Sequence, residues 1–220
     1  MAGLHALVVA CGTWPSPEVV QELAKQADHV VACDGALAVC EEYGLQADVL
    51  LGDMDSIKPE QRVAFMENGG TVVDRPAQDA NDLSKALAYL EGLSAEACSV
   101  LGATGGDPQH EWANLLSCAA SSLHITCIGT DHVFHFLNQG VNHSIEIGKG
   151  YEFSLFALPT ANEIHLSGAS FQLKGERLDM GSRGLHNVAV EHAIDLFFGE
   201  GRLMLMKPVT TQMAEGTSEA

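Results

Sequence analysis

Short apolar, β-branched runs alternate with longer helical patterns along the first 130 residues. Strands are expected at residues 4–11, 29–33, 48–51, 70–73, 98–101 and 124–128. Helices are expected between them, at residues 17–27, 36–43, 59–68, 83–93 and 108–122, with prolines near several starts and glycines after several ends. This alternation predicts an α/β fold, in which helices flank a mostly parallel, Rossmann-like sheet.

The pattern changes after residue 130. Short strand-like runs separated by Gly, Asn and Pro follow at residues 132–137, 144–147, 152–158, 164–170, 188–193 and 202–206. We therefore expect two domains, an α/β domain at residues 1–130 and an all-β sandwich at residues 131–209. Residues 210–220 are polar and aperiodic, which predicts a flexible tail.

Composition narrows the class of protein. Hydrophobic residues make up 46% of the chain and charged residues only 18%, which is typical of a globular protein and excludes general disorder. The formal charge of −18 would repel nucleic acids and anionic membrane surfaces, so we expect neither as a partner. A nucleotide remains compatible with this charge, because divalent cations bridge carboxylates to phosphates.

No apolar stretch is long enough to cross a membrane. Residues 7–11 resemble a lipoprotein cleavage site, but no Lys or Arg precedes them, which favours a buried first strand. The six cysteines show no C-x-x-C spacing, and most lie in apolar runs. They predict reduced, buried thiols in a cytoplasmic protein, with disulfides or a zinc site as the alternatives.

Acidic residues or glycines follow four successive predicted strands. Asp34 follows the second strand, Asp53 and Asp55 the third and Asp74 the fourth, whereas a glycine segment at 102–106 follows the fifth. Ligands of open α/β sheets collect outside the carboxyl ends of the strands. The sequence therefore predicts one acidic crevice lined by backbone.

The paired acids in this crevice suggest a cation site. Asp53 and Asp55 are two residues apart in what should be extended backbone, so their carboxylates would point to one side and share Mg²⁺. The alternative is that they only form a turn. Asp82 is either a ligand or a helix-start residue, and Lys85 either pairs with Asp82 or contacts phosphate.

The glycine segment 102–106 is not a P-loop, because no Gly-Lys-Ser/Thr follows it. It either presents backbone N–H groups to phosphate or forms a tight turn before the next helix. Asp107, followed by Pro108, is expected to cap that helix.

The order and spacing of these motifs resemble the thiamine pyrophosphokinase family. The matching segments are Asp34-Gly35-Ala36, Gly52-Asp53-Met54-Asp55-Ser56, the segment 78–87 from Gln78 to Leu87, the segment 102–114 from Gly102 to Asn114, and Gly184-Leu185-His186-Asn187. The resemblance implies a nucleotide- and metal-binding catalytic α/β domain, a thiamine-binding β domain and a homodimer. It also implies transfer of pyrophosphate from ATP to the thiamine hydroxyl, with release of AMP.

The resemblance also implies roles for individual residues. It assigns Mg²⁺ to Asp53, Asp55 and Asp82, with Lys85 beside them as a further catalytic residue. The nucleotide site would comprise Asp34, Gln78, Asn81, Gly105, Gly106, His110 and Asn114. Thiamine would lie near His186 and Asn187, where the family's two domains meet across the dimer.

This chain departs from the family pattern at several positions. Asp107 and Gln109 stand where the family has Arg and Asp, and His186 stands where it has Ser. Asn81 likewise replaces Thr, and Ala36 replaces Gly. Three functions follow: an active thiamine pyrophosphokinase, a pyrophosphokinase for another alcohol, or a nucleotide- or thiamine-binding protein that has lost catalysis. In an active enzyme another cation, such as Arg75 or Arg183, would replace the missing arginine.

Overall fold

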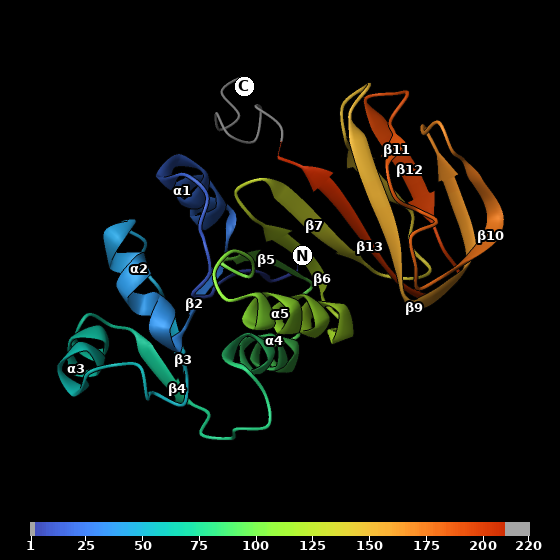
Figure 1. Ribbon diagram of the computed structural model, residues 1–220. Helices are drawn as coiled ribbons and strands as arrows, with labels where there is room; N and C mark the ends of the chain where they lie inside the picture. The colour runs from blue at the N-terminus through green and yellow to red at the C-terminus, as the bar shows by residue number, and fades with distance from the viewer. Residues whose placement is uncertain (1–2, 210–220) are drawn as a thin grey trace. The chain divides into compact units, whose positions relative to one another are not determined.

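The computed structural model describes residues 3–209, which form two compact units (Figure 1). The α/β unit ends at Thr130, except that Val209 also groups with it, and the β unit comprises Asp131–Pro208. The boundary coincides with the change of pattern in the sequence. The tail expected at residues 210–220 lies outside the described residues.

Six parallel strands form the sheet of the α/β unit, in the order β4-β3-β2-β1-β5-β6. This confirms the predicted parallel sheet. The strands are β1 (His5–Val9), β2 (His29–Cys33), β3 (Val49–Gly52), β4 (Thr71–Asp74), β5 (Ala97–Leu101) and β6 (His124–Ile128). The central strand β1 pairs Val8 with Val31 on one side and with Val100 on the other, and all three side chains are buried.

Most of the helices begin at residues that favour helix starts. They are α1 (Pro17–Gln26), α2 (Leu37–Glu42), α3 (Pro59–Glu67), α4 (Asp82–Gly92) and α5 (Pro108–Ala120), and a 3₁₀ turn (Asp34–Ala36) precedes α2. Proline occupies the first position of α1, α3 and α5, where its missing N–H costs no helical hydrogen bond. Helix α4 packs against β1, β2 and β3 and against α5 (Figure 1). Within residues 3–209, no helix is long and apolar enough to cross a membrane.

The β unit is an antiparallel sheet with the strand order β7-β13-β9-β12-β8, and β10 and β11 also pair with β9. Its strands are β7 (His132–Leu137), β8 (His143–Glu146), β9 (Glu152–Ser167), β10 (Leu173–Asp179), β11 (Asn187–Val188), β12 (Ala193–Phe197) and β13 (Glu200–Pro208). Its buried core includes Ile164, Ile194 and Phe198.

The β unit differs from the predicted strands in three places. The runs 152–158 and 164–170 are parts of one strand, β9, because Pro159 lies where the β9–β13 register shifts and no regular ladder bond is needed. Strand β10 was missed, because most of its side chains are polar and exposed. The strand expected at 188–193 lies instead at Ala193–Phe197.

The cysteine prediction holds for five of the six residues. Cys33, Cys40, Cys98, Cys118 and Cys127 are buried, and all six cysteines are free thiols. Cys11 is the exception, since it is exposed beyond the end of β1. The prediction placed Cys11 in the core because four apolar residues precede it, but the strand has already ended at Val9.

Candidate functional site

Three carboxylates converge at the carboxyl ends of β2 and β3. Asp34 opens the 3₁₀ turn after β2, and Asp53 and Asp55 follow β3. Because β2 and β3 are parallel neighbours, with Cys33 beside Leu51, their ends meet at one edge of the sheet. One oxygen from each of the three carboxylates lies within 4.8 Å of the other two. We call these residues the acid cluster.

Asp34 is the buried member of the acid cluster. Only 1% of its surface is exposed. Its Oδ2 accepts a hydrogen bond from the Ser56 N–H at 3.2 Å, and its Oδ1 has no hydrogen-bond partner in the structure. Burial raises the pKa of Asp34, the Ser56 N–H opposes that rise, and the charges of Asp82, Asp55 and Asp53 add to it. A bound cation would compensate both the burial of the Asp34 charge and its repulsion by the neighbouring acids, so this arrangement suits a cation site.

Gly52 makes room for Asp34. A Cβ atom at residue 52 would lie 2.6 Å from the Cβ of Asp34, which is closer than such atoms approach in proteins. The glycine at the end of β3 therefore allows the two strand ends to bring their acids together. The close approach of Asp34 therefore explains why the Gly-Asp-x-Asp-Ser segment begins with glycine.

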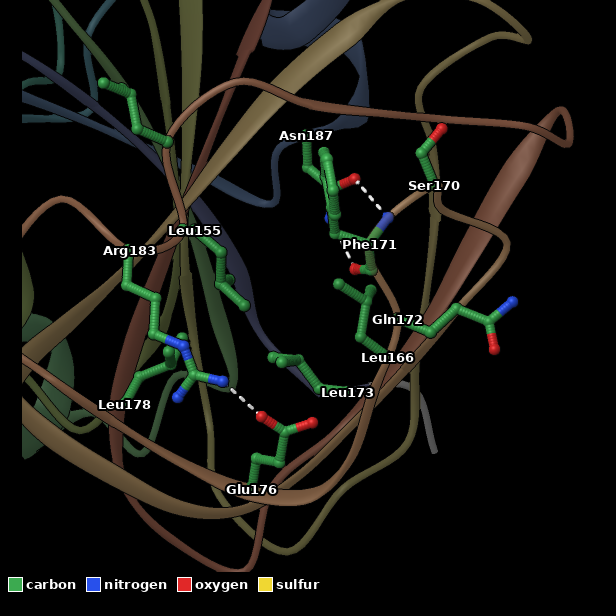
Figure 2. Close-up of a pocket in the computed structure, with 12 residues that line it drawn as sticks. Leu155, Leu166, Ser170, Phe171, Gln172, Leu173, Glu176, Leu178, Arg183 and Asn187 are labelled. Atoms are coloured by element: carbon green, nitrogen blue, oxygen red, sulfur yellow. Dashed lines mark hydrogen bonds and ion pairs between the residues drawn. The ribbon is translucent and has the colours of Figure 1, made fainter.

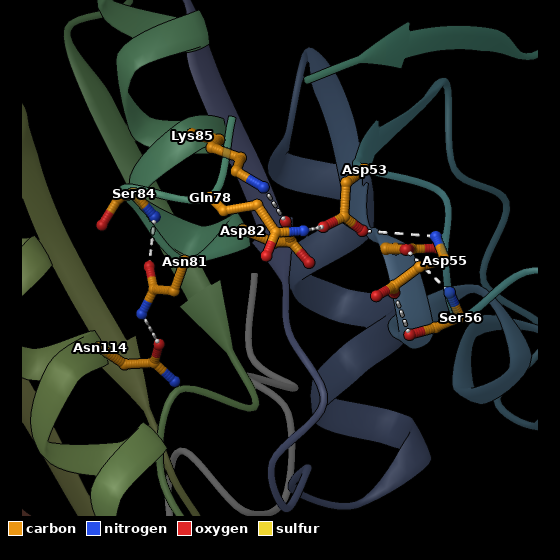
Figure 3. Close-up of polar contacts among 10 residues, drawn as sticks. Asp53, Asp55, Ser56, Gln78, Asn81, Asp82, Ser84, Lys85 and Asn114 are labelled. Atoms are coloured by element: carbon orange, nitrogen blue, oxygen red, sulfur yellow. Dashed lines mark hydrogen bonds and ion pairs between the residues drawn. The ribbon is translucent and has the colours of Figure 1, made fainter. Parts of the chain in front are cut away.

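The two paired acids are not joined by extended backbone, which corrects the prediction. Met54 between them has a φ of 65°, so the chain turns sharply at that residue. The Asp55 N–H donates to Asp53 Oδ1 at 3.3 Å, and the Ser56 hydroxyl donates to Asp55 Oδ1 at 3.0 Å (Figure 3). The turn still places both carboxylates in the acid cluster.

Asp82 stands outside the acid cluster as the described residues define it. Its Oδ1 lies 3.0 Å from Lys85 Nζ, one turn further along α4, so the structure shows the ion pair that the sequence left open. Burial alone would lower the pKa of Lys85, but the hydrogen bond and charge of Asp82, with the charges of Asp53 and Asp34, raise it overall. Lys85 is therefore a fully charged ammonium beside the acids.

Gln78 reaches the same acids from the segment before α4. Its Nε2 donates to Asp53 Oδ2 at 3.3 Å (Figure 3). Gln78 thus lies close enough to contact a ligand of the acid cluster.

Two asparagines join α4 to α5. Asn81 Oδ1 accepts from the Ser84 N–H at 2.9 Å and so caps α4, while Asn81 Nδ2 donates to Asn114 Oδ1 at 2.9 Å (Figure 3). Asn114 Nδ2 in turn donates to the Ala103 carbonyl at 3.0 Å. The amides of both residues are used within the protein, so the structure shows them as holding groups around the site.

The glycine loop, residues 102–106, follows β5 and packs on the segment after β1. Gly12 N–H donates to the Gly102 carbonyl and Thr13 N–H to the Thr104 carbonyl, both at 2.8 Å. Gly105 has a φ of 74°, and its N–H donates to Glu111 Oε2 at 2.9 Å. The Gly105 N–H, which the resemblance places in the nucleotide site, is therefore occupied by a carboxylate in this structure.

Asp107 caps α5, as the sequence predicted. Its Oδ1 accepts from the Gln109 N–H at 2.8 Å, so the side chain turns to the backbone of its own helix. His110 is exposed on the first turn of the same helix. Neither residue contacts the acid cluster through an observed hydrogen bond.

The β unit contains a pocket of about 450 Å³ near the late motif (Figure 2). Its walls combine apolar side chains, such as Leu155, Leu178 and the 71% exposed Phe171, with the ion pair between Arg183 and Glu176. Asn187 also lines the pocket, but its amide bonds the Phe171 backbone in both directions, at 3.0 and 2.8 Å. Asn187 therefore shapes the wall by holding Phe171.

His186 and Arg183 are both held by acids of the β unit. His186 is exposed, pairs with Glu152 at 3.0 Å and is not among the residues that line the pocket. Arg183 is held by Glu176 and by the Arg177 carbonyl, so its guanidinium is already engaged within the β unit. Arg75, another expected substitute for the missing arginine, directly follows β4, and its backbone N–H donates to the Gly52 carbonyl at 2.7 Å, next to the acid cluster.

Sequence reasoning missed two residues beside the site. Glu111 gave no signal, because an acid in the first turn of a helix is common for reasons of the helix dipole alone. Cys11 carried a usable signal, since it follows the first strand just as the acids follow the second and third. A Cβ at Gly35 would lie 3.0 Å from the Cys11 sulfur, which places the thiol next to the turn that carries Asp34.

Comparison with known proteins assigns this arrangement to a class. Residues 20–127, which contain the acid cluster, α4 and α5, match the family model described as "Thiamin pyrophosphokinase, catalytic domain". This match places the α/β unit in the thiamine pyrophosphokinase family. Among curated relatives, thiamine pyrophosphokinase 1 of Oryza sativa subsp. japonica is 32% identical in an alignment 113 residues long, which covers 48% of this chain and 43% of that protein. The alignment thus spans less than half the length of that relative.

Solved structures share the fold over nearly the whole chain. Thiamine pyrophosphokinase from Bacillus subtilis superposes with a TM-score of 0.76 at 18% identity, covering 93% of this chain and 99% of that one. Yeast thiamin pyrophosphokinase superposes with a TM-score of 0.75 at 12% identity, covering 99% and 90% of the two chains. At these identities the likeness establishes the fold.

Proposed function

We propose that this protein transfers the pyrophosphoryl group of ATP to the hydroxyl of thiamine, giving thiamine diphosphate and AMP. The observation that carries the proposal is the acid cluster, whose buried Asp34 has an unpartnered oxygen and which lies within the matched catalytic segment. Family membership supports the reaction class. The relatives' names supply thiamine as the acceptor.

The donor set of the acid cluster fits Mg²⁺. It offers only hard carboxylate oxygens, the ligands that this ion takes in sites where it also binds substrate phosphates. A bound Mg²⁺ would neutralise phosphate charge as it develops in the transition state. Asp34, Asp53 and Asp55 would hold the ion. Asp82 would lie beside them and orient Lys85 through their ion pair.

The chain's own residues would bind and orient the polyphosphate. Lys85 supplies a positive charge held by Asp82, with its side chain only 8% exposed, so its position is fixed before substrate binds. Gln78, already within hydrogen-bonding distance of Asp53, supplies an amide donor. In-line attack of the thiamine hydroxyl on the β-phosphorus forms one O–P bond and breaks another, so positioned charges can supply most of the catalysis.

Thiamine would use the pocket of the β unit. Its volume of about 450 Å³ and apolar walls suit an aromatic ligand. The cationic thiazolium is attracted by the strongly acidic protein as a whole. Phe171 offers an exposed ring for stacking, and Asn187 holds the backbone of that residue in place.

We also propose a homodimer. In the β unit, Met180 and Leu185 are large apolar side chains that are 72% and 47% exposed, which favours their burial in an interface. A closed two-fold dimer is the commonest oligomer among soluble proteins. Light scattering at micromolar concentration should give twice the chain mass, and a monomer would contradict the dimer.

A product assay tests the reaction. The full chain is incubated with ATP and Mg²⁺, with and without thiamine, and AMP and thiamine diphosphate are separated by chromatography. The proposal predicts equal amounts of both products, formed only with thiamine. AMP formed with another alcohol and not with thiamine would indicate a pyrophosphokinase of different specificity. Binding of ATP or thiamine without formation of AMP would indicate a binding protein that has lost catalysis. Asp107, which stands in place of the family's arginine, is the residue that favours this alternative.

A further inference from the structure

Glu111 occupies a position that no role assigned above explains. It lies in the first turn of α5, and its Oε2 accepts from the Gly105 N–H at 2.9 Å. Asn114, three residues later on the same face of α5, donates to the Ala103 carbonyl at 3.0 Å. Two side chains of one helix therefore hold two successive parts of the glycine loop, one through a donor and one through an acceptor.

The opposite side of the loop is held by backbone. Gly12 and Thr13 donate to the carbonyls of Gly102 and Thr104. A Cβ at Gly105 would lie 2.3 Å from the Thr13 hydroxyl oxygen, so the loop is packed tightly against this segment. With the loop fixed on that side, the contact from Glu111 decides whether the Gly105 end is also fixed.

The same face of α5 continues to the start of α4. Asn114 accepts from Asn81, the cap of the helix that carries Asp82 and Lys85. The glycine loop, Asn114 and the charged start of α4 are thus connected by hydrogen bonds between 2.9 and 3.0 Å. If the Glu111 contact were lost, the bond from Asn114 to the Ala103 carbonyl would be the remaining side-chain hydrogen bond that the structure describes between α5 and the glycine loop.

We propose that Glu111 is a positioning residue, whose carboxylate pins the Gly105 N–H and so fixes the glycine loop beside the start of α4. The carboxylate takes the place that an anionic ligand would have on this donor. The loop is therefore ordered by the protein itself, and substrate phosphate is left to the acid cluster, Lys85 and Gln78. The part of the proposal that concerns turnover rests on the proposed function, but the loop contact does not.

Amide hydrogen exchange at Gly105, measured by NMR, tests the contact directly. Glu111→Ala and Glu111→Asp should both speed exchange by about 10- to 100-fold, the loss of a hydrogen bond to a charged acceptor. The aspartate keeps the charge near the helix start but is one methylene too short to reach Gly105. Glu111→Gln keeps the reach and an acceptor oxygen, and should stay within about threefold of the unmodified protein. Glu60→Ala, which removes an exposed acid from the first turn of α3, is the matched control and should leave exchange unchanged.

Turnover supplies a second readout. Glu111→Asp should lower kcat about tenfold and leave KM for thiamine unchanged. Glu111→Gln, which keeps the reach to Gly105, should retain most of the kcat of the unmodified protein. The proposal is overturned if the Gly105 amide exchanges at the normal rate in Glu111→Asp. Glu111 would then act only through its charge near the start of α5. It is also overturned if Glu111→Ala tightens ATP binding, because Glu111 would then compete with phosphate. If no variant turns over, the proposed function fails, while Gly105 exchange still decides the role of Glu111.

Discussion

Asn81 donates a hydrogen bond from Nδ2 to Oδ1 of Asn114 at 2.9 Å, and this single bond joins the cap of α4 to the middle of α5. The other end of the same amide accepts from the Ser84 N–H. The Asn81 side chain thus satisfies a backbone N–H in the first turn of α4. It also couples that turn to α5, the helix that holds the glycine loop. The family's threonine is absent here, and an amide does both tasks.

We predict that Asn81→Ala lowers the free energy of unfolding by about 1–2 kcal/mol, because it removes a cap and a side-chain hydrogen bond. Asn81→Asp should retain the cap but lose the donor to Asn114, and should cost roughly half as much. Urea unfolding of these variants, of Asn114→Ala and of the double variant measures the coupling. Additive effects of Asn81→Ala and Asn114→Ala would contradict the account, which predicts a coupling of about 0.5–1 kcal/mol.

We predict that Gly52→Ala disturbs the acid cluster, because the added methyl group would meet the Cβ of Asp34 at 2.6 Å. The backbone must shift, so the melting temperature should fall and affinity for Mg²⁺ should drop about tenfold or more. Gly92→Ala is the control, since a Cβ there meets nothing within 4 Å and the residue ends a helix. It should raise stability by up to about 1 kcal/mol and leave Mg²⁺ binding unchanged. Equal Mg²⁺ affinity in both variants would contradict the packing argument.

Thiol labelling should distinguish Cys11 from the other cysteines. Cys11 is exposed, whereas burial raises the pKa of Cys40 to about 12 and also raises the pKa values of Cys33 and Cys98. Partial burial and the charges of Asp82 and Asp34 raise the pKa of Cys11 as well, so its labelling should be slow at pH 8 and should accelerate above pH 9.

Mass spectrometry after brief alkylation should find one modified residue in the native protein and none in Cys11→Ser. Mg²⁺ with ATP should slow the labelling, since the thiol lies beside the turn that carries Asp34. Labelling of several cysteines at one rate would contradict the described burial.

We predict that Arg75 contributes to ATP binding in place of the family's arginine. Its backbone is bonded to Gly52, next to the acid cluster, whereas Arg183 is engaged with Glu176 in the β unit. Arg75→Ala should raise KM for ATP several-fold, and Arg75→Lys should restore part of the loss. Arg62→Ala removes an arginine of α3 that lies 3.9 Å from Asp74 and serves as the control. An unchanged KM in Arg75→Ala would show that another group neutralises the phosphates.

The α/β unit could be predicted closely from its sequence, because its strands are short, mostly apolar runs and most of its helices have a recognisable start. The expected range 29–33 is the observed β2 (His29–Cys33), and α3 begins at Pro59 as expected. The β unit was harder. Leu173–Asp179 carries lysine, arginine and glutamate on a strand that is paired at its backbone but largely exposed, so no apolar alternation marks it.

The site was predictable as a set of acids but not as a geometry. Sequence order placed Asp34, Asp53 and Asp55 at neighbouring strand ends, since parallel strands end at one edge. It could not show the turn at Met54, because a positive φ at a methionine has no local sequence signal. Nor could it show that Glu111 would reach Gly105, which depends on how α5 lies against the loop.

The central claim is that the acid cluster binds the Mg²⁺ needed for pyrophosphoryl transfer. The most direct measurement is calorimetric titration of Mg²⁺ with ATP, together with turnover, in Asp53→Asn, Asp55→Asn and the control Asp195→Asn, an exposed acid of the β unit. The account predicts that both cluster variants lose most of their Mg²⁺-dependent ATP affinity and turnover while they remain folded, and that Asp195→Asn loses neither. Unchanged affinity and turnover in both Asp53→Asn and Asp55→Asn would contradict it.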